Sequence, residues 1–87
     1  MNLLFLERKG TIKILLYFLG KEMLRFKDLK KIIPREATLS NRINELEELK
    51  MIEAVPIKDG RRKFFAYRLT EKGERTAKKL KEINSGF

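Results

Sequence analysis

The sequence predicts an α+β fold that is mostly helical, with a three-helix core, a two- or three-stranded antiparallel sheet and a further C-terminal helix. Two observations support this prediction. Four segments space their apolar residues as helices do, and two strand-like runs flank the turn signal Asp59-Gly60. Because the chain has 87 residues, we expect a single domain that covers residues 1–87.

The composition excludes several classes of function. Hydrophobic residues make up 43% of the chain and charged residues 38%, which is typical of a globular domain. The sequence contains no Cys and no His, which form disulfides, the usual zinc sites and most acid–base catalysts at neutral pH. We therefore expect no enzyme activity, no catalytic residue, no metal and no cofactor.

The charge is strongly positive and unevenly distributed. The net charge is +9, with nine cations and three acids in residues 1–35, two and five in 36–53, and ten and four in 54–87. This pattern indicates two basic regions on either side of an acidic central element. Nucleic acid is the first partner class that such a chain suggests, and an anionic membrane surface is the second.

The apolar segments are too short for a membrane. The longest apolar run covers residues 14–19, whereas a spanning helix needs about 18 apolar residues. The run Leu3–Leu6 ends at Glu7 and lacks the length and the leading charge of a signal peptide. We expect a cytoplasmic protein whose partner is nucleic acid and not a membrane.

The first predicted helix covers residues 11–19, with Thr11 as its N-cap and Gly20 as its stop. Its apolar residues occupy two faces, so both faces should be covered. In so small a domain, we expect a second copy of the chain to provide one of the covers. The predicted homodimer contacts are Ile14, Tyr17 and Phe18, together with the apolar segment Leu3–Leu6.

A short strand at 23–25 and a helix at 26–33 are predicted next. Apolar residues at i, i+3, i+6 and i+7 from Phe26 give this helix one apolar face. Pro34 ends it, because proline cannot continue the hydrogen-bond ladder. Residues 34–37 then form a turn.

The third predicted helix covers residues 38–49, with Thr38 as its N-cap. Its buried stripe consists of Leu39, Ile43, Leu46 and Leu49. The exposed residues change character along the helix, because residues 37–44 contain no acid whereas three acids follow from Glu45 onward. The N-terminal half is therefore polar and neutral to basic, and the C-terminal half is acidic.

A β-hairpin is predicted after this helix, with strands at 51–58 and 64–70. Pro56 marks the first strand as an edge strand or a bulge. Alternation along the second strand puts Phe65 on the same face as the apolar residues that follow it. We therefore expect Phe65 to anchor the hairpin to the core.

Thr70 is the predicted N-cap of a last helix over residues 71–83. Together the elements form a winged helix-turn-helix. Two helices are joined by a tight turn over about 26–49, and a basic hairpin, the wing, follows over about 52–69.

In a helix-turn-helix the second helix enters the major groove, and its first residues contact base edges. Arg42 can make a bidentate contact to guanine, and Asn41 or Asn44 one to adenine. The wing places the cations of residues 58–63 along a phosphate backbone or in the minor groove. The predicted DNA-binding residues are Lys27, Arg35, Thr38, Ser40, Asn41, Arg42, Asn44, Lys58, Arg61, Arg62 and Lys63.

Three segments resemble a known family: MLRFKDLKKIIP at 23–34, LSNRINELEELKMIEAVP at 39–56 and YRLTEKG at 67–73. From about Thr11 to Leu80 the chain is similar to the winged helix-turn-helix transcriptional regulators of prokaryotes, in particular the HxlR-like and MarR/ArsR-like groups. The resemblance implies a homodimer that binds an operator in double-stranded DNA and represses or activates transcription. The chain departs from effector-sensing members, because it lacks a Cys or His pair and an extended ligand-binding insert.

Other interpretations are open at this point. The fold also suits a protein-interaction or RNA-binding module that recognises no operator, and Phe64 and Phe65 can stack on single-stranded bases. The basic hairpin tip can be a solvated turn. The acid-free helix start at 38–44 favours operator binding, because a module that only docks on proteins does not need it.

Overall fold

The structure, a computed structural model, describes residues 10–85. In chain order its elements are α1 (Thr11–Phe18), β1 (Leu24–Arg25), α2 (Phe26–Leu29), α3 (Glu36–Glu48), β2 (Ile52–Asp59), β3 (Arg62–Leu69) and α4 (Glu71–Ser85). The three strands form one antiparallel sheet in the order β1-β3-β2. The predicted α+β, mostly helical class is confirmed, and the sheet has three strands.

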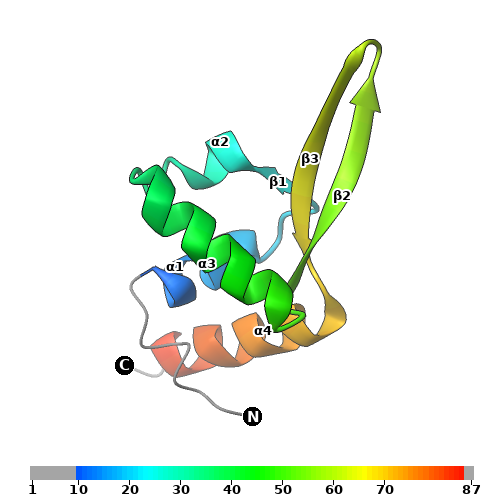
Figure 1. Cartoon of the computed structure of the whole chain (residues 1–87). Coiled ribbons are helices and arrows are strands. Elements are labelled where there is room, and N and C mark those ends of the chain that lie inside the picture. The colour runs from blue at the N-terminus through cyan, green and yellow to red at the C-terminus, as the bar shows by residue number, and fades with distance from the viewer. Residues whose placement is uncertain (1–9, 86–87) are drawn as a thin grey trace.

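The helices form the body of the molecule, and the hairpin projects from it. Figure 1 shows α1, α3 and α4 gathered together, with β2 and β3 extending well beyond them. On α3, the predicted stripe residues Leu39, Ile43 and Leu46 are at most 2% exposed. They pack in one apolar cluster with side chains of α1 and of the start of β2. This burial fixes which face of α3 points outward.

The structure corrects the predicted dimer contacts of α1. Ile14 and Phe18 are 0% exposed in the chain's own core, so they are not available to a second copy. Tyr17 is partly buried, and the ammonium group of Lys21 lies over its ring, 4.2 Å from the centroid. The remaining predicted contact, Leu3–Leu6, lies outside the described residues.

Two helices begin earlier than predicted. Gly10 is the N-cap of α1, in the left-handed region with φ +92°, so Thr11 is the first helical residue and not the cap. Arg35 is the N-cap of α3, so Thr38 is also helical and not the cap. The carboxylate of Glu36 lies in the first turn of α3, where negative charge stabilises a helix N-terminus, and the helix therefore extends past Thr38.

α2 is shorter than predicted, but the chain keeps turning after it. It covers only Phe26–Leu29. The N–H groups of Ile32 and Ile33 both donate to the Leu29 carbonyl, at 3.1 and 3.0 Å, before Pro34. The predicted pair of helices is therefore present, and the first of them is a single turn.

β2 and β3 form the predicted hairpin. Their register ends with Asp59 opposite Arg62, so that Gly60 and Arg61 form a two-residue turn. Gly60 has φ +60°, as the first central residue of a type II′ turn requires. Pro56 lies in β2 at the edge of the sheet, where a missing N–H is tolerated.

Phe65 does not anchor the hairpin as predicted, because its side chain is 61% exposed. β1 pairs with Tyr67 and Ala66, and beyond this level the hairpin leaves the helices behind (Figure 1). The two residues next to Phe65 on β3 are better covered, since Ala66 is buried and Phe64 is partly buried. Their side chains lie on the opposite face of β3.

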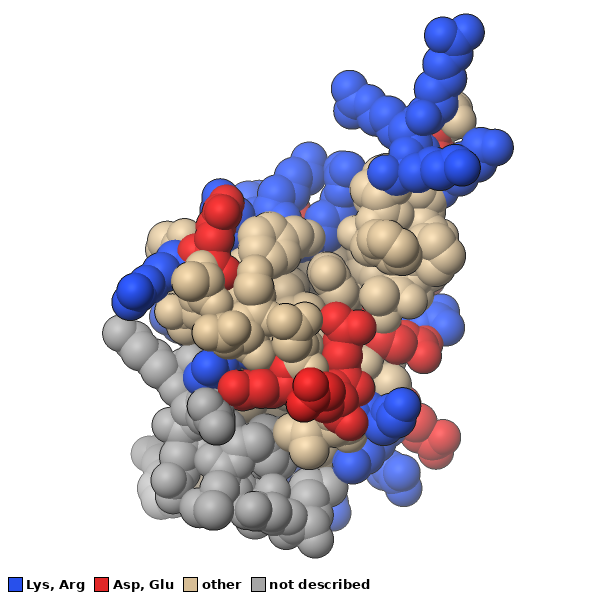
Figure 2. Space-filling model, in the orientation of Figure 1, with Lys and Arg blue, Asp and Glu red and all other residues tan. Residues whose placement is uncertain are grey.

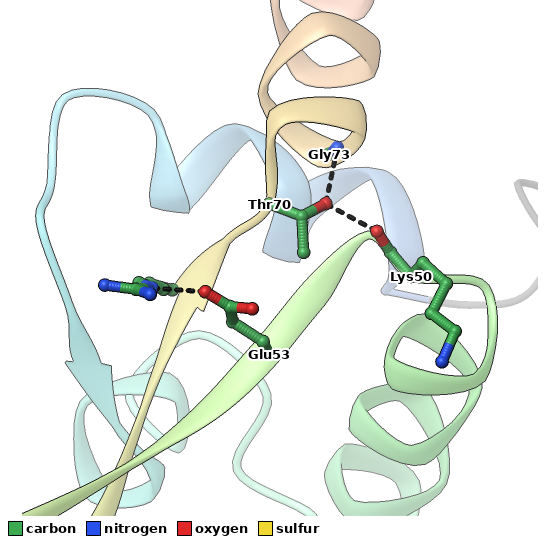
Figure 3. A network of polar contacts seen from close by, with 5 residues as sticks. Lys50, Glu53, Thr70 and Gly73 are labelled. Atoms are coloured by element: carbon green, nitrogen blue, oxygen red, sulfur yellow. Dashed lines mark hydrogen bonds and ion pairs between the residues drawn. The ribbon is translucent and has the colours of Figure 1, made fainter.

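The start of α4 is joined to the end of α3 (Figure 3). Thr70 caps α4 as predicted, since its Oγ1 accepts a hydrogen bond from the Gly73 N–H at 3.1 Å and donates to the Lys50 carbonyl. Lys50 has a left-handed backbone, with φ +62°, that ends the turn after α3 and directs the chain into β2. The segments LEELKM and LTEKG, which carry part of the family resemblance, therefore contact each other here.

Replacing Thr70 with Val should lower the free energy of unfolding by about 1–2 kcal/mol, because the cap is lost and the Lys50 carbonyl loses its donor. Urea unfolding followed by circular dichroism measures the change. Thr76→Val is the matched control, because the Thr76 hydroxyl donates to the Lys72 carbonyl within α4, at 2.9 Å. An equal loss in both variants would contradict the capping role.

Candidate nucleic-acid interface

The outward face of α3 carries short side chains, most of them polar. Because its apolar stripe points into the core, α3 leaves Ala37, Ser40, Asn41 and Asn44 exposed at i, i+3, i+4 and i+7. This spacing puts them on one face over two helical turns, so the structure brings three of the predicted site residues together. Thr38, also predicted, is partly buried.

Arg42 lies on the flank of α3 and not on this outward face. Its side chain is 11% exposed, and its Nη2 is 3.2 Å from Oε1 of Glu45. Its Nε is buried and has no hydrogen-bond partner in the part of the chain that the structure describes. A bidentate contact to guanine needs a free guanidinium fork. This placement argues against the predicted guanine contact, and Arg42 is left out of the base-reading set below.

An ion pair that the sequence analysis missed lies at the start of α3. Lys30, in the turn after α2, places its Nζ 2.6 Å from Oε1 of Glu36. The hydrogen bond from Lys30, and then its charge, lower the pKa of the Glu36 carboxyl, so this group is ionised at neutral pH. Both side chains remain accessible, at 40% and 66% exposure. Arg35, which was predicted to bind DNA, directly precedes Glu36 and is exposed.

The tip of the wing concentrates positive charge. Lys58, Arg61, Arg62 and Lys63 are all exposed, and none of them forms an ion pair with another residue in the range 10–85. Figure 2 shows Lys and Arg side chains gathered at the far end of the hairpin. Lys58 lies directly opposite Lys63 in the register, where like charges repel each other. A bound anion would relieve this repulsion, so the tip is suited to phosphate groups.

A groove separates the wing from α2 and the start of α3. Lys27, Lys30 and Glu36 line its helical side, and Phe65 and Tyr67 line the side of the wing. Lys27, which was predicted to bind DNA, is exposed in this groove. The groove therefore combines ammonium groups on one wall with aromatic rings on the other.

The orientation of the wing follows from Tyr67. Burial, and to a smaller extent the carboxylate of Glu47 on α3, raise the pKa of the Tyr67 hydroxyl, which therefore stays protonated at neutral pH. Tyr67 and Phe65 line the groove together with Glu36, so the face of the hairpin that carries Tyr67 is turned toward the start of α3. Phe65 and Lys63 share this face by alternation along β3.

Arg25 is a second residue that the sequence analysis missed. Its guanidinium carbon lies 3.8 Å from the centroid of the Phe64 ring, and its backbone N–H donates to Oδ2 of Asp28 at 2.9 Å. The cation–π contact holds the guanidinium group beside the groove and leaves its N–H groups available to an anion. Residues 25 and 64 meet only through strand pairing, so a local sequence pattern gives no signal for this contact.

Apart from Asp59, which lies opposite Arg62 in the wing, most acidic side chains of α3 and the hairpin lie away from the wing tip. The acidic belt consists of Glu45, Glu47, Glu48 and Glu53, in the C-terminal half of α3 and at the start of β2. Figure 2 shows acidic side chains in a band across the body, well below the wing tip. Glu53 is also paired with Arg68 on β3. The predicted change from a polar to an acidic surface along α3 is therefore present in three dimensions.

Neither a metal site nor a membrane span is found among residues 10–85. No three or more acidic side chains in this range are grouped so that they can hold a metal ion. No helix in the same range is long and apolar enough to cross a membrane.

Comparison with known sequences gives one family. A family model described as HxlR-like helix-turn-helix matches residues 6–85 of the chain. A comparison with curated protein sequences gave no significant match. The family match spans every element of the structure, from α1 to α4.

Several solved structures share the fold. A transcriptional regulator homologue from Pyrococcus horikoshii OT3 matches with a TM-score of 0.78 and 19% identity, over 99% of this chain and 90% of that one. The reduced form of the transcriptional regulator YodB from B. subtilis matches with a TM-score of 0.76 and 24% identity, over 93% of this chain and 79% of that one. A MarR-family regulator from Porphyromonas gingivalis W83 matches with a TM-score of 0.75 and 21% identity, over 94% and 80%. The architecture is therefore that of known regulators.

Proposed function

The chain belongs to the HxlR-like helix-turn-helix family, and on this premise we propose that it binds a specific sequence in double-stranded DNA as a homodimer and regulates transcription in the cytoplasm. The outward face of α3 carries the proposal. Ser40, Asn41 and Asn44 are exposed there with no acid between them, beside a wing whose cations have no acidic partner in the described chain. Membership in a family of regulators also argues against an enzyme.

In this proposal α3 lies in the major groove with Asn41 and Asn44 as base readers. An Asn side chain pairs with the N6 and N7 atoms of adenine in a bidentate contact. Ser40 lies beside them on the same face and can accept from or donate to a base edge. We therefore expect adenine at two positions of each half-site.

The register of the wing divides its cations between two roles. Lys58 and Lys63 are cross-strand partners on the hairpin face that is turned toward the start of α3. With α3 in the major groove, these lysines would contact the phosphate backbone that runs between α3 and the wing, together with Lys27 in the groove. Arg61 occupies the turn at the end of the wing, and we assign it to the minor groove, where a narrow groove strengthens the field that an Arg experiences.

One observation favours a second candidate, the binding of single-stranded nucleic acid such as RNA. Phe65 is 61% exposed beside the basic tip, and an exposed aromatic ring in a positive groove is a stacking platform for unpaired bases. The duplex proposal is preferred because stacking on Phe65 would not use the polar face of α3.

Selection of bound duplexes from a random pool at near-physiological salt tests the proposal. A two-fold dimer should select a palindrome whose half-site centres lie about 10 bp apart. If roughly 6–10 phosphates are contacted, affinity should fall on the order of 10³-fold or more between about 50 and 200 mM salt. The absence of a consensus, or a flat salt dependence, would reject the proposal. Equal affinity for duplex DNA and single-stranded RNA would favour the second candidate.

Replacing Asn41 with Ala should reduce the preference for adenine at one position by roughly 5- to 150-fold, which corresponds to about 1–3 kcal/mol for a bidentate pair. Competition between duplexes that differ only at that position measures the change. Arg61→Ala is the contrasting variant, because it should weaken binding to all sequences while the preference for adenine persists. The reverse pattern would show that α3 positions the protein and the wing reads the sequence.

A further inference from the structure

We propose that Glu36 is a specificity-determining residue that selects cytosine at the base pair facing the start of α3. This inference rests on the proposed function and adds a base reader that follows from where α3 begins. The observations that support it are the position of Glu36 on α3, its contact with Lys30, and the donor and acceptor pattern of the major groove.

Glu36 continues the base-reading face toward the N-terminus of α3. It is the first residue of the helix, and it lies in one row with Ser40 and Asn44 at i, i+4 and i+8. Its side chain is 66% exposed, which makes it accessible to a ligand. In helix-turn-helix proteins the residues that contact base edges lie at the N-terminal end of the second helix. Glu36 therefore occupies a position from which a side chain reaches a base.

Lys30 makes a carboxylate tolerable at this place. Its Nζ holds Oε1 of Glu36 at 2.6 Å and supplies a positive charge that offsets repulsion between the carboxylate and nearby phosphates. Because Lys30 comes from the turn after α2, it also restricts where the carboxylate can point. No hydrogen bond or ion pair to the second oxygen, Oε2, is formed within residues 10–85, so Oε2 is left to accept from a base.

An ionised carboxylate discriminates between bases because it only accepts hydrogen bonds. In the major groove cytosine presents the N4 amino group as a donor, and Glu is the side chain that accepts from it. Guanine and thymine present acceptors, which repel a carboxylate. Adenine has the N6 donor but places the N7 acceptor next to it, so it is the weaker alternative. Cytosine is therefore the base that fits Glu36 best.

Sequence selection from a random duplex pool with the unaltered chain, Glu36→Gln and Glu36→Ala tests the inference. The unaltered chain should select cytosine at one position of each half-site, which is a column of the aligned selected sequences. Glu36→Gln should move that column to adenine, because a Gln amide pairs with N6 and N7 together. Glu36→Ala should remove the base preference at that position, with a loss of preference for cytosine over guanine of roughly 5- to 100-fold. All other columns should be unchanged.

Glu48→Gln is the matched control, since Glu48 is an exposed acid at the other end of α3, and this variant should leave every column unchanged. Circular dichroism of each variant shows whether α3 still forms. If the unaltered chain selects a consensus and the Glu36 variants shift no column, or change affinity for all sequences alike, this inference is overturned while the proposed function stands. If the unaltered chain selects no consensus, both fail.

Discussion

Replacing Lys58, Arg61, Arg62 and Lys63 together with Gln should reduce the affinity for duplex DNA on the order of 10³-fold at about 0.1 M salt. The wing tip holds these four exposed cations, which form no ion pair in the described chain and would lie close to the DNA phosphates, with Arg61 between the two backbones of the minor groove. Each phosphate contact that is lost should also make the plot of log affinity against log salt shallower by about 0.9, or by roughly 3–4 for all of them. Fluorescence anisotropy titrations at several salt concentrations measure both quantities.

The matched control removes the same amount of charge elsewhere. Replacing Arg75, Lys78, Lys79 and Lys81 on α4 with Gln gives the same net charge, on a helix that lies at the end of the body away from the wing tip (Figure 1). This variant should keep most of its affinity and its salt slope. If both variants lose affinity equally, net charge and not the placement of the wing governs binding.

Replacing Gly73 with Ala should lower the free energy of unfolding by about 2–4 kcal/mol. A Cβ atom at this position would lie 1.9 Å from the Met51 carbonyl oxygen, which is backbone and cannot move aside without displacing β2. Helix propensity alone predicts the opposite sign, since Ala stabilises a helix interior relative to Gly by about 1 kcal/mol. The steric conflict is the larger effect, because α4 begins directly against the turn that follows α3. Urea unfolding of the purified variant measures the change.

Gly20→Ala provides the comparison, because a Cβ at Gly20 meets no atom within 4 Å. Its cost comes only from the backbone conformation, φ +79°, and should be about 1–2 kcal/mol. The loss at Gly73 should therefore exceed the loss at Gly20. A Gly73→Ala variant that is more stable than the unaltered chain would show that α4 can shift away from Met51 at little cost.

The elements that the sequence predicted well depend on local signals. The helix at α3 follows from apolar residues at i, i+4 and i+7, and the hairpin follows from strand-like runs around a Gly turn. The cap at Thr70 also depends on nearby atoms, since its hydroxyl accepts from the N–H three residues on. The same local rules misplaced the cap of α3, because a Thr hydroxyl and an acidic first turn stabilise a helix start by similar amounts. They also misplaced the cap of α1, where Gly10 takes that position with a left-handed backbone.

The site was predicted less completely, because exposure depends on the tertiary arrangement. Arg42 has a favourable position in the sequence, yet it lies on a flank that the fold covers. Phe65 lies on the same strand face as the apolar residues that follow it, yet it lies beyond the part of β3 that pairs with β1, and its side chain is exposed. The pairs Lys30–Glu36 and Arg25–Phe64 join separate elements, and only the folded chain brings them together.

The separation of the acidic belt from the wing tip contributes an electric dipole directed along the wing. The belt carries Glu47, Glu48 and Glu53 on the body, and the wing carries the cations at the other end of a projecting hairpin. In the field of a DNA duplex such a dipole experiences a torque that turns the wing toward the phosphates during diffusional approach. Encounters that would otherwise begin with the wrong face are reoriented before contact, which raises the association rate most strongly at low ionic strength.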